Sequence, residues 1–237
     1  MSSNIKHLAK IVLFSVPVLL STACRTDPVQ ANDQEHVDQN MNSIFNLVES
    51  NNIQALQSFI RNNPQSITQR NARQETALMQ ALYQDKFEIA TQLILAGADV
   101  NAQDAMQNTP FLYAGAEGDT EIVKLALQHG AKFDIYNRYK GTALIPAAEK
   151  GHVETVALLA NTPNYPINHV NRLGWTALME AVILSDGGPK HQQTLKILLD
   201  AGADANIADH QGVTPLQHAK SRHFTAMVQL LENRGAK

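Results

Sequence analysis

The chain has 237 residues, of which 44% are hydrophobic and 17% are charged, and its formal net charge is −3. This balance argues against a nucleic-acid partner, because basic residues alternate with acidic ones and form no basic stripe. The single cysteine, Cys24, excludes a disulfide within the chain, so apolar packing must stabilise any folded domain.

Residues 1–23 are predicted to be a signal peptide. Lys6 and Lys10 precede a mostly apolar run at residues 11–20, which is too short for a bilayer-spanning helix of about 20 residues. Ser21 and Ala23 then supply a small-x-small cleavage signal before Cys24. Removing this segment leaves 17 basic and 22 acidic residues, a net charge of −5.

Cys24 resembles the lipid-bearing cysteine of bacterial lipoproteins. The match to that family's lipobox is incomplete, because Leu20 lies four residues before the cysteine and Ser21 fills the expected leucine position. The resemblance implies lipidation at Cys24, and the alternative is a plain thiol inside a cleaved or uncleaved leader. Residues 24–40 are polar and lack periodicity, and they are predicted to be a tether.

Five similar phrases follow in the rest of the chain, and each begins with a threonine. They start at Thr76, Thr109, Thr142, Thr176 and Thr214, with steps of 33, 33, 34 and 38 residues. Gly-Ala pairs recur in step with them at Gly97, Gly130, Gly202 and Gly235, and an earlier copy begins at Ser43. A period near 33 residues is typical of a repeat protein.

Each unit is predicted to contain two helices. The threonine hydroxyl can cap the first helix, and Pro110 and Pro215 suit a first helical position. The second helix, exemplified by residues 121–130, is expected to end at a glycine in the left-handed conformation. Alanines such as Ala81 and Ala147 allow close approach of neighbouring units, which bury together an apolar face that one unit cannot bury alone.

This pattern resembles the ankyrin repeat, through its period and its Thr-Pro-Leu-His-like phrases such as "TPLQHA". The resemblance covers residues 41–237 and implies an all-α solenoid of helix-turn-helix units with finger loops. We expect six repeats, near 41–71, 72–104, 105–137, 138–171, 172–209 and 210–237.

The sequence departs from the family pattern at several places. The motif histidine is replaced in every copy, by Met79, Leu112, Ile145, Met179 and Gln217. The loop after the fourth unit reads "NTPNYPINHVN" without a Gly-Ala pair and is expected to be irregular. In the first unit Pro64 replaces the helix-ending glycine. The extra residues "LSDGGPKH" are expected to form a surface insertion between the two helices of the fifth unit.

The chain contains no pattern typical of catalysis or metal binding. Its histidines are scattered over different units, no His-x-x-x-His pair with a glutamate occurs, and no Gly-x-Ser-x-Gly or phosphate-binding glycine motif is present. We therefore expect no catalytic residue, metal or cofactor.

The resemblance implies that a partner protein binds on the concave surface. In the family the contact positions lie four, three and one residues before the motif threonine, and seven and eight after it. Among the matching positions we expect binding energy to concentrate in Tyr83, Met106, Arg138, Tyr139, Arg172, Leu173 and Trp175. The alternative for Leu173 and Trp175 is packing against the irregular loop after the fourth unit.

The expected function is a non-enzymatic, monomeric protein-interaction module of the bacterial cell envelope, periplasmic or lipid-anchored. It would act as a stabiliser of a periplasmic enzyme, an immunity partner of a toxin, or a scaffold. A host-directed effector is a further alternative, against which the leader argues. The alternative of a different class is a metal-binding or enzymatic accessory of the periplasm.

Export is expected to remove residues 1–23 and to leave Cys24 acylated at the new N-terminus. Mass spectrometry of the protein from its own cells checks this, since the mature mass should include the acyl groups. A free N-terminal cysteine would contradict lipidation but not export, whereas an uncleaved soluble product would contradict both.

Overall fold

The computed structural model describes residues 43–237, which fold into helices joined by turns and loops. The helices are α2 (Ile44–Glu49), α3 (Ile53–Asn62), the 3₁₀ helix η1 (Pro64–Thr68), α4 (Ala77–Tyr83), α5 (Phe87–Leu95), α6 (Pro110–Glu117), α7 (Thr120–Gln128), α8 (Leu144–Glu149), α9 (Val153–Ala160), α10 (Ala177–Ile183), α11 (Pro189–Asp200), α12 (Pro215–Ser221) and α13 (Thr225–Glu232). An isolated antiparallel bridge between Arg70 and Thr76 is the extended pairing found within this range. The expected all-α solenoid is confirmed. The predicted signal peptide, Cys24 and the tether lie outside the described residues.

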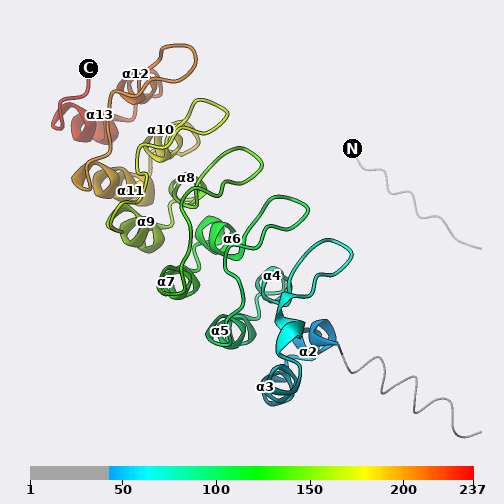
Figure 1. The fold of residues 1–237 in the computed structure, drawn as a ribbon. Helices are drawn as coiled ribbons and strands as arrows, with labels where there is room; N and C mark the ends of the chain where they lie inside the picture. The colour runs from blue at the N-terminus through cyan, green and yellow to red at the C-terminus, as the bar shows by residue number, and fades with distance from the viewer. Residues whose placement is uncertain (1–42) are drawn as a thin grey trace, which may run out of the picture.

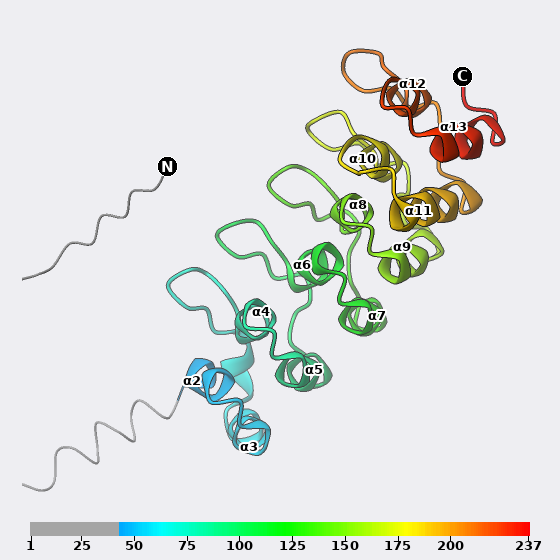
Figure 2. The ribbon, with the colours of Figure 1, turned by 180° about the vertical axis from the view of Figure 1, so that it is seen from behind.

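The helices stack in two rows (Figure 1). The even-numbered helices form an inner row and the odd-numbered helices an outer row, and the view from behind shows the same arrangement (Figure 2). Each helix contacts its counterpart in the next unit, as α8 contacts α10 and α9 contacts α11. Five finger loops project from the side of the inner row, and we name them by their residues: 69–75, 102–108, 135–141, 169–175 and 207–213.

Side-chain caps start most of the inner helices, as predicted. The hydroxyl oxygens of four threonines accept the amide proton three residues later, at Thr76 (3.2 Å), Thr109 (3.1 Å), Thr176 (3.1 Å) and Thr214 (3.3 Å). Ser43 caps α2 in the same way at 3.2 Å. In the last unit Gln217 accepts the Thr214 amide proton at 2.9 Å and completes a capping box.

The fourth unit is the exception, and the predicted cap at Thr142 is wrong. α8 begins at Leu144, one residue later than the other inner helices, and the amide of Leu144 donates to the hydroxyl of Tyr165 at 3.2 Å. Pro146 accounts for the delay, because the residue at this position in the other units donates its N–H to the threonine carbonyl, and proline has no N–H. Tyr165, buried in the loop after α9, therefore takes over the start of α8.

The outer helices end in the predicted way where a glycine is present. Gly97, Gly130, Gly202 and Gly235 have φ between +77° and +93°, a left-handed conformation that glycine adopts without a steric cost. After α9 the chain turns through Asn164 at φ +61° instead. After α3 the chain continues into η1, which begins at Pro64.

The core repeats with the same period as the threonines. Two residues after each threonine, or after its equivalent, lies a buried large side chain, and these are Leu78, Phe111, Leu144, Leu178 and Leu216. Three residues further on is an alanine with no exposure, at Ala81, Ala114, Ala147, Ala181 and Ala219. Four of the five residues in the histidine position are apolar and buried, so apolar packing replaces the missing histidine there. Burial of each leucine or phenylalanine contributes about 1.5–3 kcal/mol.

The insertion in the fifth unit is a loop only in part. Residues 184–188 form the loop, but Pro189 occupies the first position of α11, where proline is favoured. The insertion thereby lengthens α11 to 12 residues, whereas the other outer helices have 8 to 10.

Close stacking makes Gly115 in α6 sensitive to any added side chain. A Cβ built on Gly115 would lie 2.6 Å from the Cβ of Ala143 in the next unit. We expect Gly115→Ala to lower the free energy of unfolding by about 1–2 kcal/mol in urea denaturation, because overpacking outweighs the higher helix propensity of alanine. The double variant with Ala143→Gly, which removes the clashing methyl, should recover part of the loss. A Gly115→Ala protein as stable as the parent would contradict this account of the stacking.

Candidate functional site

One asparagine or aspartate side chain holds each finger loop. Its Oδ1 accepts the backbone N–H groups two and four residues later, at 2.8–3.1 Å in every finger. These finger Asn/Asp residues are Asn71, Asp104, Asn137, Asn171 and Asp209. Their backbone N–H groups also bond across each loop, at 2.9–3.1 Å, to the carbonyl four residues later. The fingers are therefore fixed hairpin-like turns, and they hold the side chains on them in set positions.

The sequence analysis missed these residues, although a signal was present. Each lies five residues before a motif threonine, so they repeat at the same intervals of 33, 33, 34 and 38 residues. A search for a recurring Asn or Asp, and not only for recurring Thr and Gly, would have found them.

The 135–141 and 169–175 fingers contact each other directly. The backbone N–H of Arg172 donates to the carbonyl of Tyr139 at 2.8 Å. The guanidinium carbons of Arg138 and Arg172 lie 5.1 Å and 5.6 Å from the centre of the Tyr139 ring, within the range of a cation–π interaction. The structure thus brings three of the predicted contact residues together into one cluster.

A pocket of about 290 Å³ opens between these two fingers and the inner helices α8 and α10. Its lining residues are Asn137, Tyr139, Gly141, Ile145, Pro146, Glu149, Asn171, Leu173, Trp175, Glu180 and Leu184. The side chains of Tyr139, Leu173 and Leu184 are 42%, 43% and 45% exposed, and Trp175 is half-buried. We call this the finger pocket.

Glu180 on α10 is the buried ionisable group of the finger pocket. Its side chain is 5% exposed, and its Oε1 accepts a hydrogen bond from Asn171 Nδ2 at 2.8 Å. Burial, together with the charge of Glu149, raises the pKa of the Glu180 carboxyl to about 7. Asn171 therefore connects this carboxyl to the finger that carries Leu173 and Trp175.

Two predicted contact residues lie outside the finger pocket. Met106 is exposed on the 102–108 finger. Tyr83, at the end of α4, donates its hydroxyl proton to Asp104 at 2.6 Å and accepts from Asn108 at 2.9 Å. Burial and the bond to Asp104 raise the pKa of Tyr83, so this hydroxyl is engaged in holding a finger.

The irregular loop after α9 has its own packing partners. His169 stacks on Tyr136 with ring centres 4.4 Å apart, and its Nε2 lies 2.6 Å from the carbonyl of Lys140. Tyr165 packs on Phe133 with ring centres 4.9 Å apart. Trp175, by comparison, lines the finger pocket.

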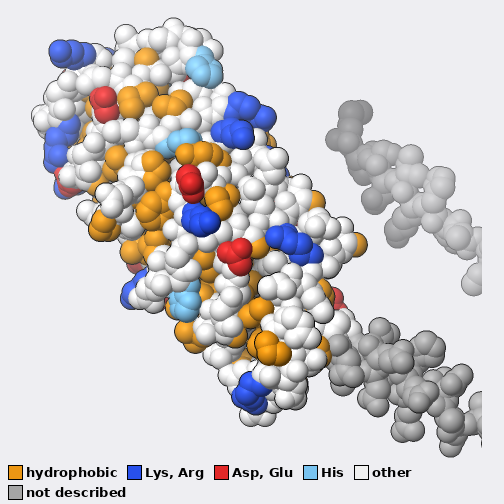
Figure 3. All heavy atoms as spheres, viewed as in Figure 1, with side chains coloured by type: hydrophobic (Ala, Val, Ile, Leu, Met, Phe, Trp, Pro, Cys, Tyr) orange, Lys and Arg blue, Asp and Glu red, His pale blue; other side chains and the backbone are white. Residues whose placement is uncertain are grey.

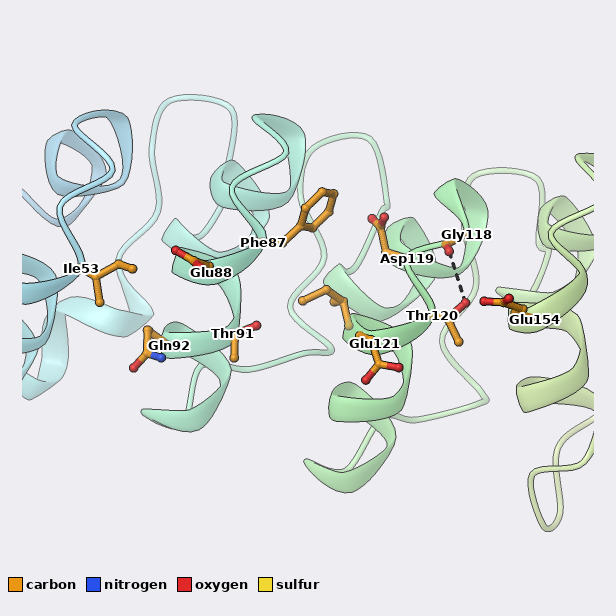
Figure 4. Close-up of a pocket in the computed structure, with 11 residues that line it drawn as sticks. Ile53, Phe87, Glu88, Thr91, Gln92, Gly118, Asp119, Thr120, Glu121 and Glu154 are labelled. Atoms are coloured by element: carbon orange, nitrogen blue, oxygen red, sulfur yellow. Dashed lines mark hydrogen bonds between the residues drawn. The ribbon is translucent and has the colours of Figure 1, made fainter.

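A larger hollow, of about 680 Å³, lies along the outer row near the first turns of α5 and α7 (Figure 4). Its rim carries four carboxylates, those of Glu88, Asp119, Glu121 and Glu154. Three of these glutamates stand in the first turns of α5, α7 and α9, where a helix N-terminus stabilises negative charge. Helix formation therefore accounts for most of this acidic rim.

The surface and its ionisable groups show a mixed character. On the face drawn in Figure 3, hydrophobic patches lie among scattered basic and acidic side chains. Within residues 43–237 no cluster of three or more histidine, cysteine, aspartate or glutamate side chains could hold a metal ion. The helices of this part of the chain are all too short or too polar to cross a membrane.

Comparison with known proteins finds repeated matches to one family. The model for ankyrin repeats in three copies matches residues 44–137, 78–169, 111–209 and 163–237. The ankyrin repeat protein YahD of Escherichia coli K12 is 36% identical over 162 residues, which are 68% of this chain and 81% of YahD. An ankyrin repeat domain of Acinetobacter baumannii has a similar structure, with 47% identity, a TM-score of 0.78, and coverage of 82% of this chain and 98% of that domain. The ankyrin repeat protein EF0377 is 33% identical with the same TM-score, over 83% of this chain and 98% of its own.

The Glu180 carboxyl is expected to make stability depend on pH. Its folded pKa of about 7 lies above its ordinary value of 4.5, so the folded state binds the proton more tightly, and the free energy of unfolding falls as pH rises from 4.5 to above 7. The full effect is about 3 kcal/mol. Urea denaturation at pH 5 and pH 8 should show that Glu180→Gln loses this part of the pH dependence and is more stable than the parent at pH 8. Equal pH dependence in both proteins would contradict a raised pKa.

Proposed function

The chain belongs to the ankyrin-repeat family, whose repeats are protein-interaction modules, and on that premise we propose that it binds a partner protein across the 135–141 and 169–175 fingers. The interaction is non-enzymatic, and a single copy of the chain makes it. Stacked repeats suit this role because they present an extended surface to a partner.

The observation that carries the proposal is the group of exposed apolar side chains around the finger pocket. Tyr139, Leu173 and Leu184 each leave more than two fifths of their surface in water, although the chain has a continuous core. Apolar side chains that gather at one place on a surface mark an interaction site more strongly than scattered ones. Arg138 and Arg172 beside them are of the type that most often contributes binding energy, together with tyrosine and tryptophan.

We further propose that the protein works in the cell envelope, either free in the periplasm or anchored through a lipid on Cys24. The support is the order of basic, apolar and small residues before Cys24, which is typical of an exported protein. Three kinds of partner fit this compartment: an enzyme to be stabilised, a toxin to be blocked, and a component of an envelope complex.

Site-specific photo-crosslinking in the source cells identifies the partner. A photoreactive amino acid at Arg138 should capture one defined protein. The same amino acid at Leu95, which is exposed on the outer helix α5, is the matched control and should not capture it. Capture from Leu95 alone would place the partner on the outer row and contradict the proposed surface.

Replacing side chains of the cluster should weaken binding of the captured partner. We expect Tyr139→Ala and Arg138→Ala each to cost about 2 kcal/mol, roughly a 30-fold increase in Kd, with little change in melting temperature because both side chains are exposed. Leu95→Ala serves as the control and should bind like the parent. Unchanged affinity in both finger variants would exclude these fingers as the site.

Trp175→Ala distinguishes an interface residue from a packing residue. As part of the interface, Trp175 should lose a similar amount of binding energy while the melting curve changes little. A much lower melting temperature would instead indicate that Trp175 supports the loop it lies in.

A further inference from the structure

Folding does not explain why position 180 carries an acid. In the second unit the equivalent position, four residues after the threonine, is Gln80, which donates to the carbonyl of Phe45 at 3.2 Å. An uncharged amide therefore suffices at this position of the inner helix. A carboxylate that is 5% exposed costs free energy unless a cation pairs with it.

The finger pocket contains a second carboxylate and lacks a cation of its own. Glu149 at the end of α8 also lines the pocket, and its charge acts on Glu180. The described chain places no lysine, arginine or histidine side chain in the lining. The neighbouring Lys150 is paired with Glu117 at 2.8 Å. Two carboxylates thus face one small space without a positive partner from the described residues.

The walls of the pocket suit the stem of a long basic side chain. Tyr139, Leu173 and Leu184 supply apolar and aromatic surface near the opening, and the acids lie with them in the lining. Lysine and arginine pack their methylene groups on apolar surface and keep the charged end for a polar partner. Aromatic rings such as that of Trp175 also attract cations.

We propose that the finger pocket receives one lysine or arginine side chain of the partner protein, with its stem on the apolar walls and its charged end at Glu180 and Glu149. This inference rests on the proposed function and specifies the chemistry of the partner at that site. Arg138 and Arg172 do not compete for the acids, because they lie over the Tyr139 ring and outside the lining.

Small probes of defined charge test the proposal on the full chain. The blocked amino acids Nα-acetyl-lysine methylamide and Nα-acetyl-arginine methylamide carry the cation, and Nα-acetyl-norleucine methylamide has a stem of the same kind without it. The indole N–H signal of Trp175 in NMR spectra reports on the pocket without ambiguity, because the chain has a single tryptophan. At pH 8 at least one cationic probe should bind about tenfold more tightly than the norleucine probe, as expected for a charge-assisted hydrogen bond.

Glu180→Gln should remove this preference for the cation and leave norleucine binding unchanged. It should fold, because glutamine occupies the same position in the second unit. Glu232→Gln, which removes an exposed acid on α13, is the matched control and should keep the preference. Equal binding of the charged and neutral probes by the parent, or a preference that survives Glu180→Gln, would overturn the proposal.

The outcome is separable from that of the proposed function. If the cationic probes show no preference while Tyr139→Ala still weakens the captured partner, the fingers bind the partner but not through a basic side chain. If the probes behave as expected while the partner binds all finger variants equally, the pocket is selective for cations but the partner binds elsewhere.

Discussion

The finger loops of this protein depend on one recurring interaction, the acceptance of two backbone N–H groups by a single side-chain oxygen. A loop of this length would otherwise leave those groups to water and would vary in conformation. With Asn137 and Asn171 in place, two fingers have defined shapes, and their backbones bond to each other between Arg172 and Tyr139. The finger pocket exists because both loops are held in this way.

Stability and recognition reside in different parts of each unit. The buried leucine and alanine positions recur in almost every unit, and their role is to stack neighbours closely. The residue four places after the threonine varies, as Gln80, Tyr113, Pro146, Glu180 and His218. Each sits beside its own finger, and two of them bond to the finger Asn/Asp residue: Glu180 to Asn171 at 2.8 Å and His218 to Asp209 at 2.7 Å. Variation at this position changes the chemistry next to a finger without changing the stack.

Periodicity in the sequence predicts those features that depend on one unit or on identical neighbours. The recurrence of Thr76 and its equivalents located the inner helices, and the glycines located the ends of most outer helices. The prediction failed at Thr142 because Pro146 removes a backbone donor and Tyr165 replaces the cap from 21 residues away. The helical half of the insertion was missed because Pro189 starts a helix as readily as it ends one. Glu180 was not recognised, since its environment is built by side chains of two units and two fingers.

Tyr165 also bears on the order in which the chain can fold. The other inner helices are capped by residues that immediately precede them, so their first turns can form while the rest of the unit is still unfolded. The first turn of α8 receives its hydrogen bond only when the chain beyond α9 has returned and Tyr165 is buried. Closing that loop costs chain entropy before the bond forms. The fourth unit therefore depends on a late contact, and folding that begins in the units on either side must reach it last.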